Sequence, residues 1–345
     1  MKKIVFTGGG TLGHVMPNIY LFDELKHEFE CSYIGGSGIE KEKIKDIMLY
    51  YEIPTVKLIR GKILNNFKIP FVLISAIIKA KKILREIRPN VVFSKGGYVA
   101  LPVCIAARML KIPIVSHESD ASFGLANKII LRVSDVMCVN FKNLENKNKK
   151  IVYTGPLFSK EYENNKKDFS TLNLDKSKPT ILIVGGSLGS KKINSNVFVI
   201  LKDLLQNFNI IHITGKGNNK IKSYGSYNAF GTTNQMVNFY NIADFVIGRS
   251  GAGVTAECFF KELPMLLIPL QNKASRGDQV LNAKYYANQG VAHVLAEKDL
   301  NPTMMINEIN NFYKNLNQYK NNYQNIKKIN GKEKIIEIIK NVKNS

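Results

Sequence analysis

The sequence predicts an α/β protein built from two Rossmann-like domains, each with a parallel sheet. Short apolar strands alternate with amphipathic helices, a pattern typical of parallel sheets with helices on both faces. A strand, a glycine loop and a helix occur in that order twice, once near the N-terminus and again from residue 180. The length of 345 residues also fits two domains of about 150 residues each.

Each half has its own series of strands. The first half opens with a strand at 3–6, a glycine loop at 8–13 and a helix through 17–29, whose apolar residues recur at helical spacing. Further strands are expected there at 31–34, 91–93, 114–116 and 136–139. The second half repeats the opening with a strand at 180–184, a glycine loop at 185–190 and a helix through 197–204. Its further strands are expected at 210–213, 245–247 and 265–268.

These patterns divide the chain into an N-terminal domain at 1–158 and a C-terminal domain at 180–325. The polar residues at 159–179, rich in Lys, Asn, Asp and Ser, are expected to form a linker or a surface excursion. The last segment, 326–345, has apolar residues at helical spacing, and we expect it to be a helix that packs back on the body.

The charge balance is strongly basic, with 49 Lys and Arg against 27 Asp and Glu, a net charge of +22. This predicts an anionic partner, unless the Lys- and Asn-rich composition merely solvates the surface. No recognisable nucleic-acid-binding motif accompanies the charge, so no nucleic acid partner is expected. The four cysteines are far apart and form no CxxC pair, which predicts no zinc site and a reduced, cytosolic protein.

His14 directly follows the first glycine loop, which fits a GxGxxG pattern at Gly8, Gly10 and Gly13. Such a loop lets the backbone approach a phosphate at the N-terminus of the next helix. A histidine there, with an ordinary pKa near ~6.5, can act as a general base, or it can simply cap the helix. A dinucleotide cofactor is not predicted, because no carboxylate ends the second strand and Glu40 comes late.

Other polar residues follow strand ends, where ligands bind in open α/β sheets. In the first half these are residues 94–98 and the His-Glu-Ser-Asp cluster at 117–120. In the second half, residues 249–253 precede a helix in which Glu257 can bind a ribose diol, and polar residues at 275–282 follow another strand. The sequence has no Asp-x-Asp motif, so neither a carboxylate-held Mg²⁺ nor another metal or cofactor is predicted.

Eight segments stand in order along nearly the whole chain: GGGTLGHVMP (8–17), FSKGGYVALP (93–102), HESDASFGLANK (117–128), TGP (154–156), VGGSLGSKKIN (184–194), HITGKGN (212–218), ADFVIGRSGAGVTAE (243–257) and NKASRGDQVLNA (272–283). Together they resemble the MurG-type glycosyltransferases of bacterial cell-wall synthesis. The resemblance implies a GT-B fold, in which two Rossmann-like domains face a cleft. It also implies inverting transfer of GlcNAc from UDP-GlcNAc, bound mainly by the C-terminal domain. The implied acceptor is lipid I (undecaprenyl-diphospho-MurNAc-pentapeptide), bound by the N-terminal domain, and the product is lipid II.

The resemblance further implies roles for individual residues. His14 is the expected general base for the C4 hydroxyl of MurNAc, with Glu118 and Asp120 as alternative bases. The residues expected to bind the substrates are Thr11, Leu12, Gly13, Ser187, Thr233, Ala252, Gly253, Glu257, Gln279 and Asn282. Among them, Ser187 is expected at the diphosphate, Thr233 at the uracil ring and Glu257 at the ribose hydroxyls.

The chain departs from the family pattern at two places. Some members have His-Glu-Gln-Asn where this chain has His-Glu-Ser-Asp, so a carboxyl group at Asp120 replaces an amide. The family often carries an arginine after the TGxP turn, where this chain has Ser159 followed by Lys160. A lysine supplies a point charge rather than a bidentate fork, so we expect weaker donor binding rather than loss of activity.

A lipid-linked acceptor implies a peripheral enzyme at the cytoplasmic face of the cell membrane. Residues 60–64 and 67–84 combine apolar side chains with lysines, which suits docking on an anionic membrane surface. The alternative is a core helix with solvated lysines. Two other functions stay open: another GT-B enzyme that uses a UDP-sugar, such as a lipid glycosyltransferase or a UDP-GlcNAc 2-epimerase, and a non-enzymatic protein that binds nucleic acid.

Overall fold

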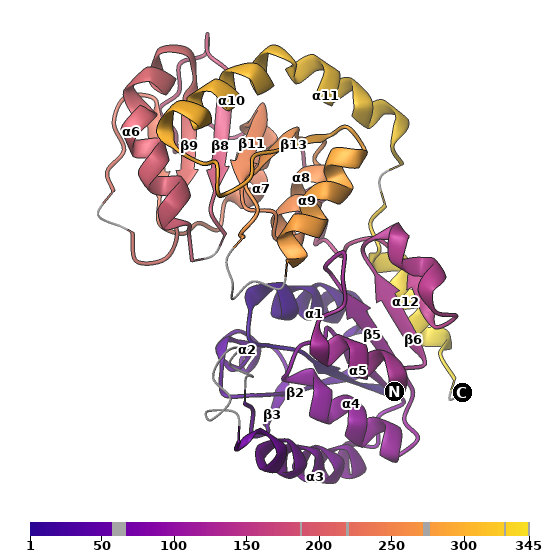
Figure 1. Cartoon of the computed structure of the whole chain (residues 1–345). Helices are drawn as coiled ribbons and strands as arrows, with labels where there is room; N and C mark the ends of the chain where they lie inside the picture. The colour runs from indigo at the N-terminus through magenta and orange to yellow at the C-terminus, as the bar shows by residue number, and fades with distance from the viewer. Residues whose placement is uncertain (57–66, 187, 219–220, 272–276, 328, 344–345) are drawn as a thin grey trace. The chain divides into compact units, whose positions relative to one another are not determined.

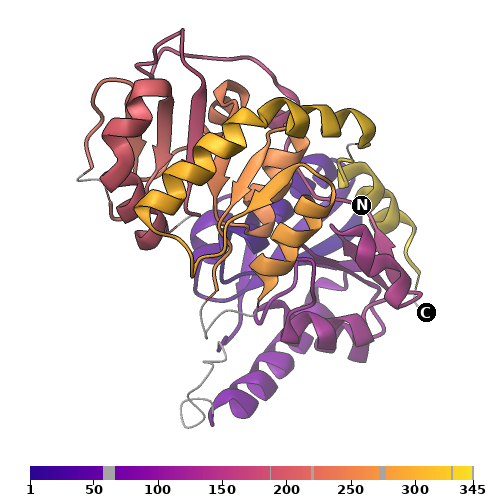
Figure 2. The ribbon, with the colours of Figure 1, turned by 45° about the horizontal axis from the view of Figure 1, so that its top comes forward.

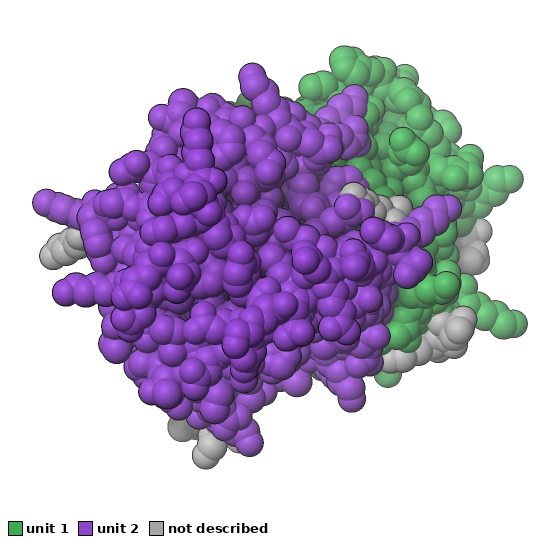
Figure 3. Space-filling view, turned by 90° about the horizontal axis from the view of Figure 1, so that it is seen from above, with its two compact units in different colours: residues 1–159, 329–345 green, residues 160–328 purple. Residues whose placement is uncertain are grey.

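The computed structural model describes residues 1–56, 67–186, 188–218, 221–271, 277–327 and 329–343. The chain forms two compact units, coloured separately in Figure 3. Unit 1 comprises Met1–Ser159 together with Ile329–Ser345, and unit 2 comprises Lys160–Lys328. None of the helices in the described part of the chain combines the length and the hydropathy needed to cross a bilayer.

Unit 1 contains a seven-stranded parallel sheet in the order β3-β2-β1-β4-β5-β6-β7 (Figure 1). Its strands are β1 (Lys2–Thr7), β2 (Phe29–Gly35), β3 (Leu49–Glu52), β4 (Val91–Ser94), β5 (Ile114–Glu118), β6 (Val136–Val139) and β7 (Ile151–Tyr153). Its α-helices are α1 (Leu12–Leu25), α2 (Ile39–Ile44), α3 (Ile69–Ile87), α4 (Ala100–Met109), α5 (Leu125–Val133) and α12 (Lys332–Asn341). Because the strands are parallel, the loops after β1, β4 and β5 lie together at the carboxyl end of the sheet.

The helices of unit 1 form two groups. Helix α4 packs against both α3 and α5, whereas α1 packs against α2 and α12. Helix α12 belongs to the core of unit 1, because Ile335 and Ile339 are buried among residues of β1, α1 and β4. Two ion pairs reinforce this packing: Lys332 Nζ lies 2.8 Å from Glu24 Oε1 on α1, and Lys340 Nζ lies 2.6 Å from Glu28 Oε1 in the turn that follows α1.

Unit 2 contains a six-stranded parallel sheet in the order β10-β9-β8-β11-β12-β13. Its strands are β8 (Thr180–Val184), β9 (Asn209–Ile213), β10 (Tyr227–Phe230), β11 (Phe245–Gly248), β12 (Met265–Leu267) and β13 (Ala292–Val294). Its α-helices are α6 (Lys191–Asn207), α7 (Met236–Ile242), α8 (Ala252–Phe260), α9 (Asp278–Asn288), α10 (Pro302–Lys314) and α11 (Leu316–Asn322). Helices α6 and α10 bury one face of the sheet, and Figure 2 shows α10 running across it. Helix α8 packs against α9.

The segment 160–179 belongs to unit 2, which fits a surface excursion, one of the two alternatives expected for 159–179, rather than a free linker. It follows the surface of unit 2 and is held there by asparagine side chains. Asn209, Asn228 and Asn238 each accept a main-chain N–H from this segment through Oδ1 and return a hydrogen bond to a main-chain carbonyl through Nδ2, at 2.7–2.9 Å. These amides pair with the segment as the backbone of a neighbouring strand would. The polar composition of the segment therefore reflects a specific hydrogen-bonded contact with the rest of unit 2.

Candidate active site

The first glycine loop is closed by a buried carboxylate. Glu40 Oε2 accepts a hydrogen bond from the Gly10 N–H at 3.0 Å, and Oε1 accepts one from the Gly36 N–H at 3.2 Å. Gly10 has a φ of 81°, and a Cβ there would lie 2.7 Å from the ring of Tyr98. Glycine is therefore required at this turn, and Glu40 shapes the loop through its two hydrogen bonds.

His14 lies in the first turn of α1 and is half-buried. Its Nδ1 is 3.0 Å from the Gly9 carbonyl oxygen. Because that oxygen can only accept, Nδ1 carries the hydrogen in this contact and the lone pair of the neutral ring is on Nε2. A Cβ at Gly97 would lie 3.2 Å from Nδ1, so the loop after β4 packs against the ring. The contacts of Nδ1 and of the ring with Gly9 and Gly97 thus fix the orientation of the imidazole. Thr11, Leu12 and Gly13 precede it at the start of α1, and Thr11 and Gly13 are exposed.

Glu118 and Asp120, the alternative bases, occupy different environments. Glu118 is buried, and its oxygens accept hydrogen bonds from the N–H groups of Asp120 and Gly124 and from Asn127 Nδ2. Burial and the neighbouring Asp120 raise the pKa of Glu118. Asp120 is half-exposed. Asp120 is therefore the more exposed of the two residues, and Glu118 orders the loop that carries it.

Beneath this loop lies a buried polar cluster that joins two of the polar segments expected at the site, 94–98 and 117–120. Lys95 is 1% exposed, and its Nζ contacts His117 Nδ1 at 2.7 Å and Ser119 Oγ. Burial lowers the pKa of Lys95 to about 8, although Glu118 and Asp120 act in the opposite direction. Burial and then Lys95 hold the pKa of His117 well below its ordinary 6.5. The available signal was a lysine two residues after the apolar strand expected at 91–93.

The second glycine loop leads from β8 into α6. Ser190 caps this helix, because its Oγ accepts a hydrogen bond from the Ile193 N–H at 3.3 Å. Ser187, the predicted diphosphate contact, lies outside the described residues. Helix α8 begins after β11, and the predicted residues Ala252 and Gly253 form its first turn. The helix N-termini at α6 and α8 thus follow the carboxyl ends of adjacent strands.

Glu257 is fixed by two tyrosines. Its Oε2 accepts a hydrogen bond from the Tyr240 hydroxyl at 2.7 Å, and Tyr162, from the 3-10 helix Lys160–Glu163, is a second donor. Burial raises the pKa of Glu257, and both tyrosine hydroxyls act against that rise. The residue is half-buried, and its hydrogen bond with Tyr240 fixes the orientation of the carboxylate.

The remaining predicted contacts in unit 2 differ in exposure. Gln279 is half-buried, and its Oε1 accepts a hydrogen bond from the Leu270 N–H at 2.9 Å. Thr233 is half-buried, and its hydroxyl accepts a hydrogen bond from the Gln235 N–H. Asn282 is 0% exposed and donates to the Ser250 carbonyl oxygen at 3.1 Å. In this position Asn282 holds the loop between β11 and α8, and its expected contact with a substrate stays a prediction.

A second unpredicted feature is the buried ion pair of Arg249 and Glu297. The guanidinium of Arg249 also donates to Ser190 Oγ at 2.9 Å and to the Ile268 carbonyl oxygen at 3.0 Å. Burial alone would raise the pKa of Glu297, but the Gln271 N–H and Arg249 hold it below its ordinary value. The pair connects the N-cap of α6, the end of β11 and the segment after β12. It therefore fixes three loops at the carboxyl end of the sheet.

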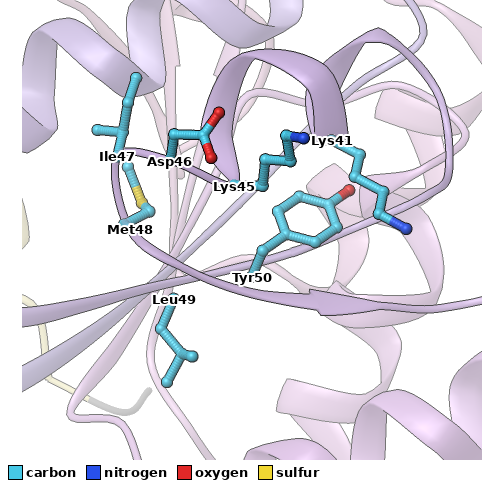
Figure 4. A pocket seen from close by; sticks show the side chains of 7 residues that line it. All are labelled: Lys41, Lys45, Asp46, Ile47, Met48, Leu49 and Tyr50. Carbon is cyan, nitrogen blue, oxygen red and sulfur yellow. The ribbon is translucent and has the colours of Figure 1, made fainter.

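The hollow in Figure 4 contains none of the predicted site residues. It has a volume of about 600 Å³ and lies between α2 and β3, where Lys41, Lys45 and Tyr50 contribute to its lining. It is an open depression at the edge strand of the sheet. Within the described residues, no group of three or more His, Cys, Asp and Glu side chains is placed to hold a metal ion.

The model of the glycosyltransferase family 28 N-terminal domain matches residues 4–138, and that of the family 28 C-terminal domain matches residues 180–339. A Clostridium botulinum protein named UDP-N-acetylglucosamine--N-acetylmuramyl-(pentapeptide) pyrophosphoryl-undecaprenol N-acetylglucosamine transferase is 44% identical, covering 98% of this chain and 97% of its own. A Bacillus cereus relative, named as transferase 2 of the same activity, is 40% identical over 99% of both chains. The crystal structure of Acinetobacter baumannii MurG has a TM-score of 0.80 and 25% identity, and covers 99% of this chain and 100% of its own.

The chain belongs to the MurG family of glycosyltransferases. The predicted GT-B fold and the predicted enzyme class, glycosyltransferase, are therefore confirmed. Membership of the MurG family also accounts for the duplicated architecture, since one family model matches each half of the chain.

Proposed function

We propose that the chain transfers GlcNAc from UDP-GlcNAc to the C4 hydroxyl of MurNAc in lipid I, with inversion at the anomeric carbon and without a metal ion. The product is lipid II, used for peptidoglycan synthesis. The observation that carries the proposal is the 44% identity, over nearly the full length, to a relative whose name states GlcNAc transfer to this lipid-linked acceptor. The residue geometry then supports a role for each unit.

Unit 1 supplies the acceptor site and the base. His14 Nε2, which has the lone pair when Nδ1 donates to the Gly9 carbonyl, takes the proton of the C4 hydroxyl. The hydroxyl oxygen bonds to the anomeric carbon on the face opposite UDP, and the bond from that carbon to the β-phosphate oxygen breaks. The electron pair leaves with UDP. Asp120 is the alternative base, and it is better exposed than Glu118.

Unit 2 supplies the donor site. The fixed carboxylate of Glu257 accepts hydrogen bonds from the two ribose hydroxyls, the backbone at Thr233 meets the uracil ring, and Gln279 reaches the donor sugar or the ribose. The leaving diphosphate is stabilised by the N-termini of α6 and α8, whose N–H groups and positive dipole ends are directed at an anion. Ala252 and Gly253 contribute N–H groups at α8. These groups take the place of a divalent ion.

Association with an anionic membrane surface is proposed through α3. Phe71, Ile74 and Ile78 are 67%, 56% and 64% exposed and recur at helical spacing, with Phe67 just before the helix. The side chains of Lys79 and Lys82 are exposed beside them. An apolar stripe with lysines suits peripheral docking at the cytoplasmic face of the membrane. The other predicted segment, 60–64, lies outside the described residues.

UDP release, measured with and without lipid I, tests the proposed reaction. We expect release from UDP-GlcNAc only when lipid I is present, together with the appearance of lipid II. Release that does not depend on lipid I would contradict the proposal and favour another UDP-sugar enzyme of the same fold. Binding of DNA without binding of UDP-GlcNAc would favour a nucleic-acid-binding protein.

A further inference from the structure

The cluster around Lys95 holds a serine hydroxyl in a defined direction. Lys95 is buried at the end of β4, and its Nζ contacts His117 Nδ1 and Ser119 Oγ. An ammonium group has three donors and no acceptor, so it uses a lone pair of the Ser119 oxygen and leaves the hydroxyl hydrogen to point elsewhere. Asn140 Nδ2 holds the Ser119 carbonyl at 3.3 Å, so the residue is fixed on two sides.

The next residue supplies the complementary group. Ser119 and Asp120 are both half-exposed, whereas the Lys95 beneath them is buried. In the described part of the chain, Ser119 Oγ has Lys95 as its hydrogen-bond partner and no other. The loop therefore carries a hydroxyl group and a carboxylate on two consecutive half-exposed residues. A sugar hydroxyl both donates and accepts, so a pair of this kind matches its chemistry.

We propose that Ser119 and Asp120 bind a hydroxyl group of the acceptor sugar, and that Lys95 is a positioning residue which keeps the Ser119 hydroxyl directed toward it. This inference rests on the proposed function. In the proposed acceptor, carbons 1, 2 and 3 of MurNAc are substituted, which leaves hydroxyls at C4 and C6. A donor aimed at the C4 oxygen would weaken it as a nucleophile, so the hydroxyl bound by Ser119 is the one at C6.

The direction of the hydroxyl depends on the charge of Lys95. A neutral amine has a lone pair and can accept from Ser119, which turns the hydroxyl inward and removes the donor from the sugar. The titratable groups that face Lys95 are His117 and Glu118 on β5, Asp120 in the loop and Cys138 on β6. The His117 ring is neutral above its low pKa, and burial raises the pKa of Cys138 to about 12. Affinity for the acceptor is thus expected to fall as the pH rises past about 8.

Calorimetric titration of the full chain with a short-chain lipid I, and with its 6-deoxy analogue, tests the inference. Ser119→Ala should weaken binding of lipid I roughly 5- to 30-fold, the range for losing one hydrogen bond, with the KM for UDP-GlcNAc unchanged. The 6-deoxy analogue should bind the wild type and Ser119→Ala equally. Lys95→Met should weaken binding of lipid I and abolish its decline between about pH 7 and pH 9.5. Ser122→Ala, the same change in the same loop, is the matched control and should bind as the wild type does.

Two outcomes would overturn the inference: wild-type affinity in Ser119→Ala, or an equal loss in that variant for lipid I and for the 6-deoxy analogue. A failure of the proposed function is distinguishable from both, because the wild type would then neither bind lipid I nor convert it. Conversion of lipid I by the wild type, together with unchanged binding by Ser119→Ala, would overturn the role of Ser119 alone.

Discussion

Replacing Lys95 with methionine should change the stability of the fold in a pH-dependent way. The methionine side chain is close in length to lysine and carries no charge, so it fits the same buried position. Lys95 is 1% exposed, and burial lowers its pKa from an ordinary 10.5 to about 8. The protonated amine is therefore less stable in the folded chain than in the unfolded chain, by about 3 kcal/mol for that pKa difference.

The sign of this pH dependence follows from whether the folded or the unfolded chain keeps the proton on Lys95 at a given pH. Below about pH 8 both states are protonated, and the full cost of burying the ammonium is present. As the pH rises from about 8 toward 10.5, the folded chain loses the proton first, so the wild type gains stability relative to Lys95→Met. Between about pH 7 and pH 9.5 the difference in unfolding free energy should shift by about 2 kcal/mol in favour of the wild type.

Urea unfolding at the two pH values, followed by far-UV circular dichroism, measures this shift; the chain has no tryptophan for a fluorescence signal. The exposed Lys128 on α5 provides the control, and Lys128→Met should show no such shift. A difference between wild type and Lys95→Met that stays constant from about pH 7 to pH 9.5 would refute the burial of a titrating ammonium at this position.

Three further predictions test the site and the membrane surface. His14→Ala should lower kcat roughly 10²- to 10⁴-fold and leave UDP affinity unchanged by calorimetry, while the exposed His27→Ala keeps wild-type kcat; a fully active His14→Ala would exclude the histidine as base. Tyr240→Phe removes a hydrogen bond to Glu257 and should raise the KM for UDP-GlcNAc about 5- to 30-fold, whereas the exposed Tyr313→Phe should not; equal KM values would contradict the assigned ribose contact. Ile74→Ser with Ile78→Ser should reduce co-sedimentation with anionic vesicles about 10-fold or more, and Val199→Ser, at an exposed apolar residue of unit 2, should not; undiminished binding by the double variant would exclude this face of α3.

The sequence predicts the central strands of both sheets but not their edge strands. Every predicted strand is present in the structure, whereas β3, β7, β10 and β13 were not predicted, and these four are the edge strands of the two sheets. Central strands of a parallel sheet are buried on both faces and form continuous apolar runs. Edge strands are partly exposed and short: Leu49–Glu52 is exposed at both ends, so no periodicity distinguishes it from a loop.

The site was predictable as far as topology determines it. Polar residues that follow parallel strands lie together at the carboxyl end of the sheet. This rule locates His14 and 117–120 at that end of the sheet in unit 1, and 249–257 at that end in unit 2. The partners within each loop were not predictable, because they depend on contacts between distant positions. Glu40 closes the loop at Gly10 from 30 residues away, and Asn282 is turned inward to Ser250. Lys95 lies in the segment 94–98 expected at the site, but its burial was not predictable, because a lysine in a loop is ordinarily exposed.

The central claim is that the MurG-family chain transfers GlcNAc to lipid I by inversion and without a divalent ion. Incubation with UDP-GlcNAc and lipid I in excess EDTA, followed by proton NMR of the purified product, tests it most directly. The account predicts undiminished formation of lipid II, with the new GlcNAc in the β configuration opposite to that of the α-linked donor. An α-linked product, or transfer that stops in EDTA and returns with Mg²⁺, would contradict it.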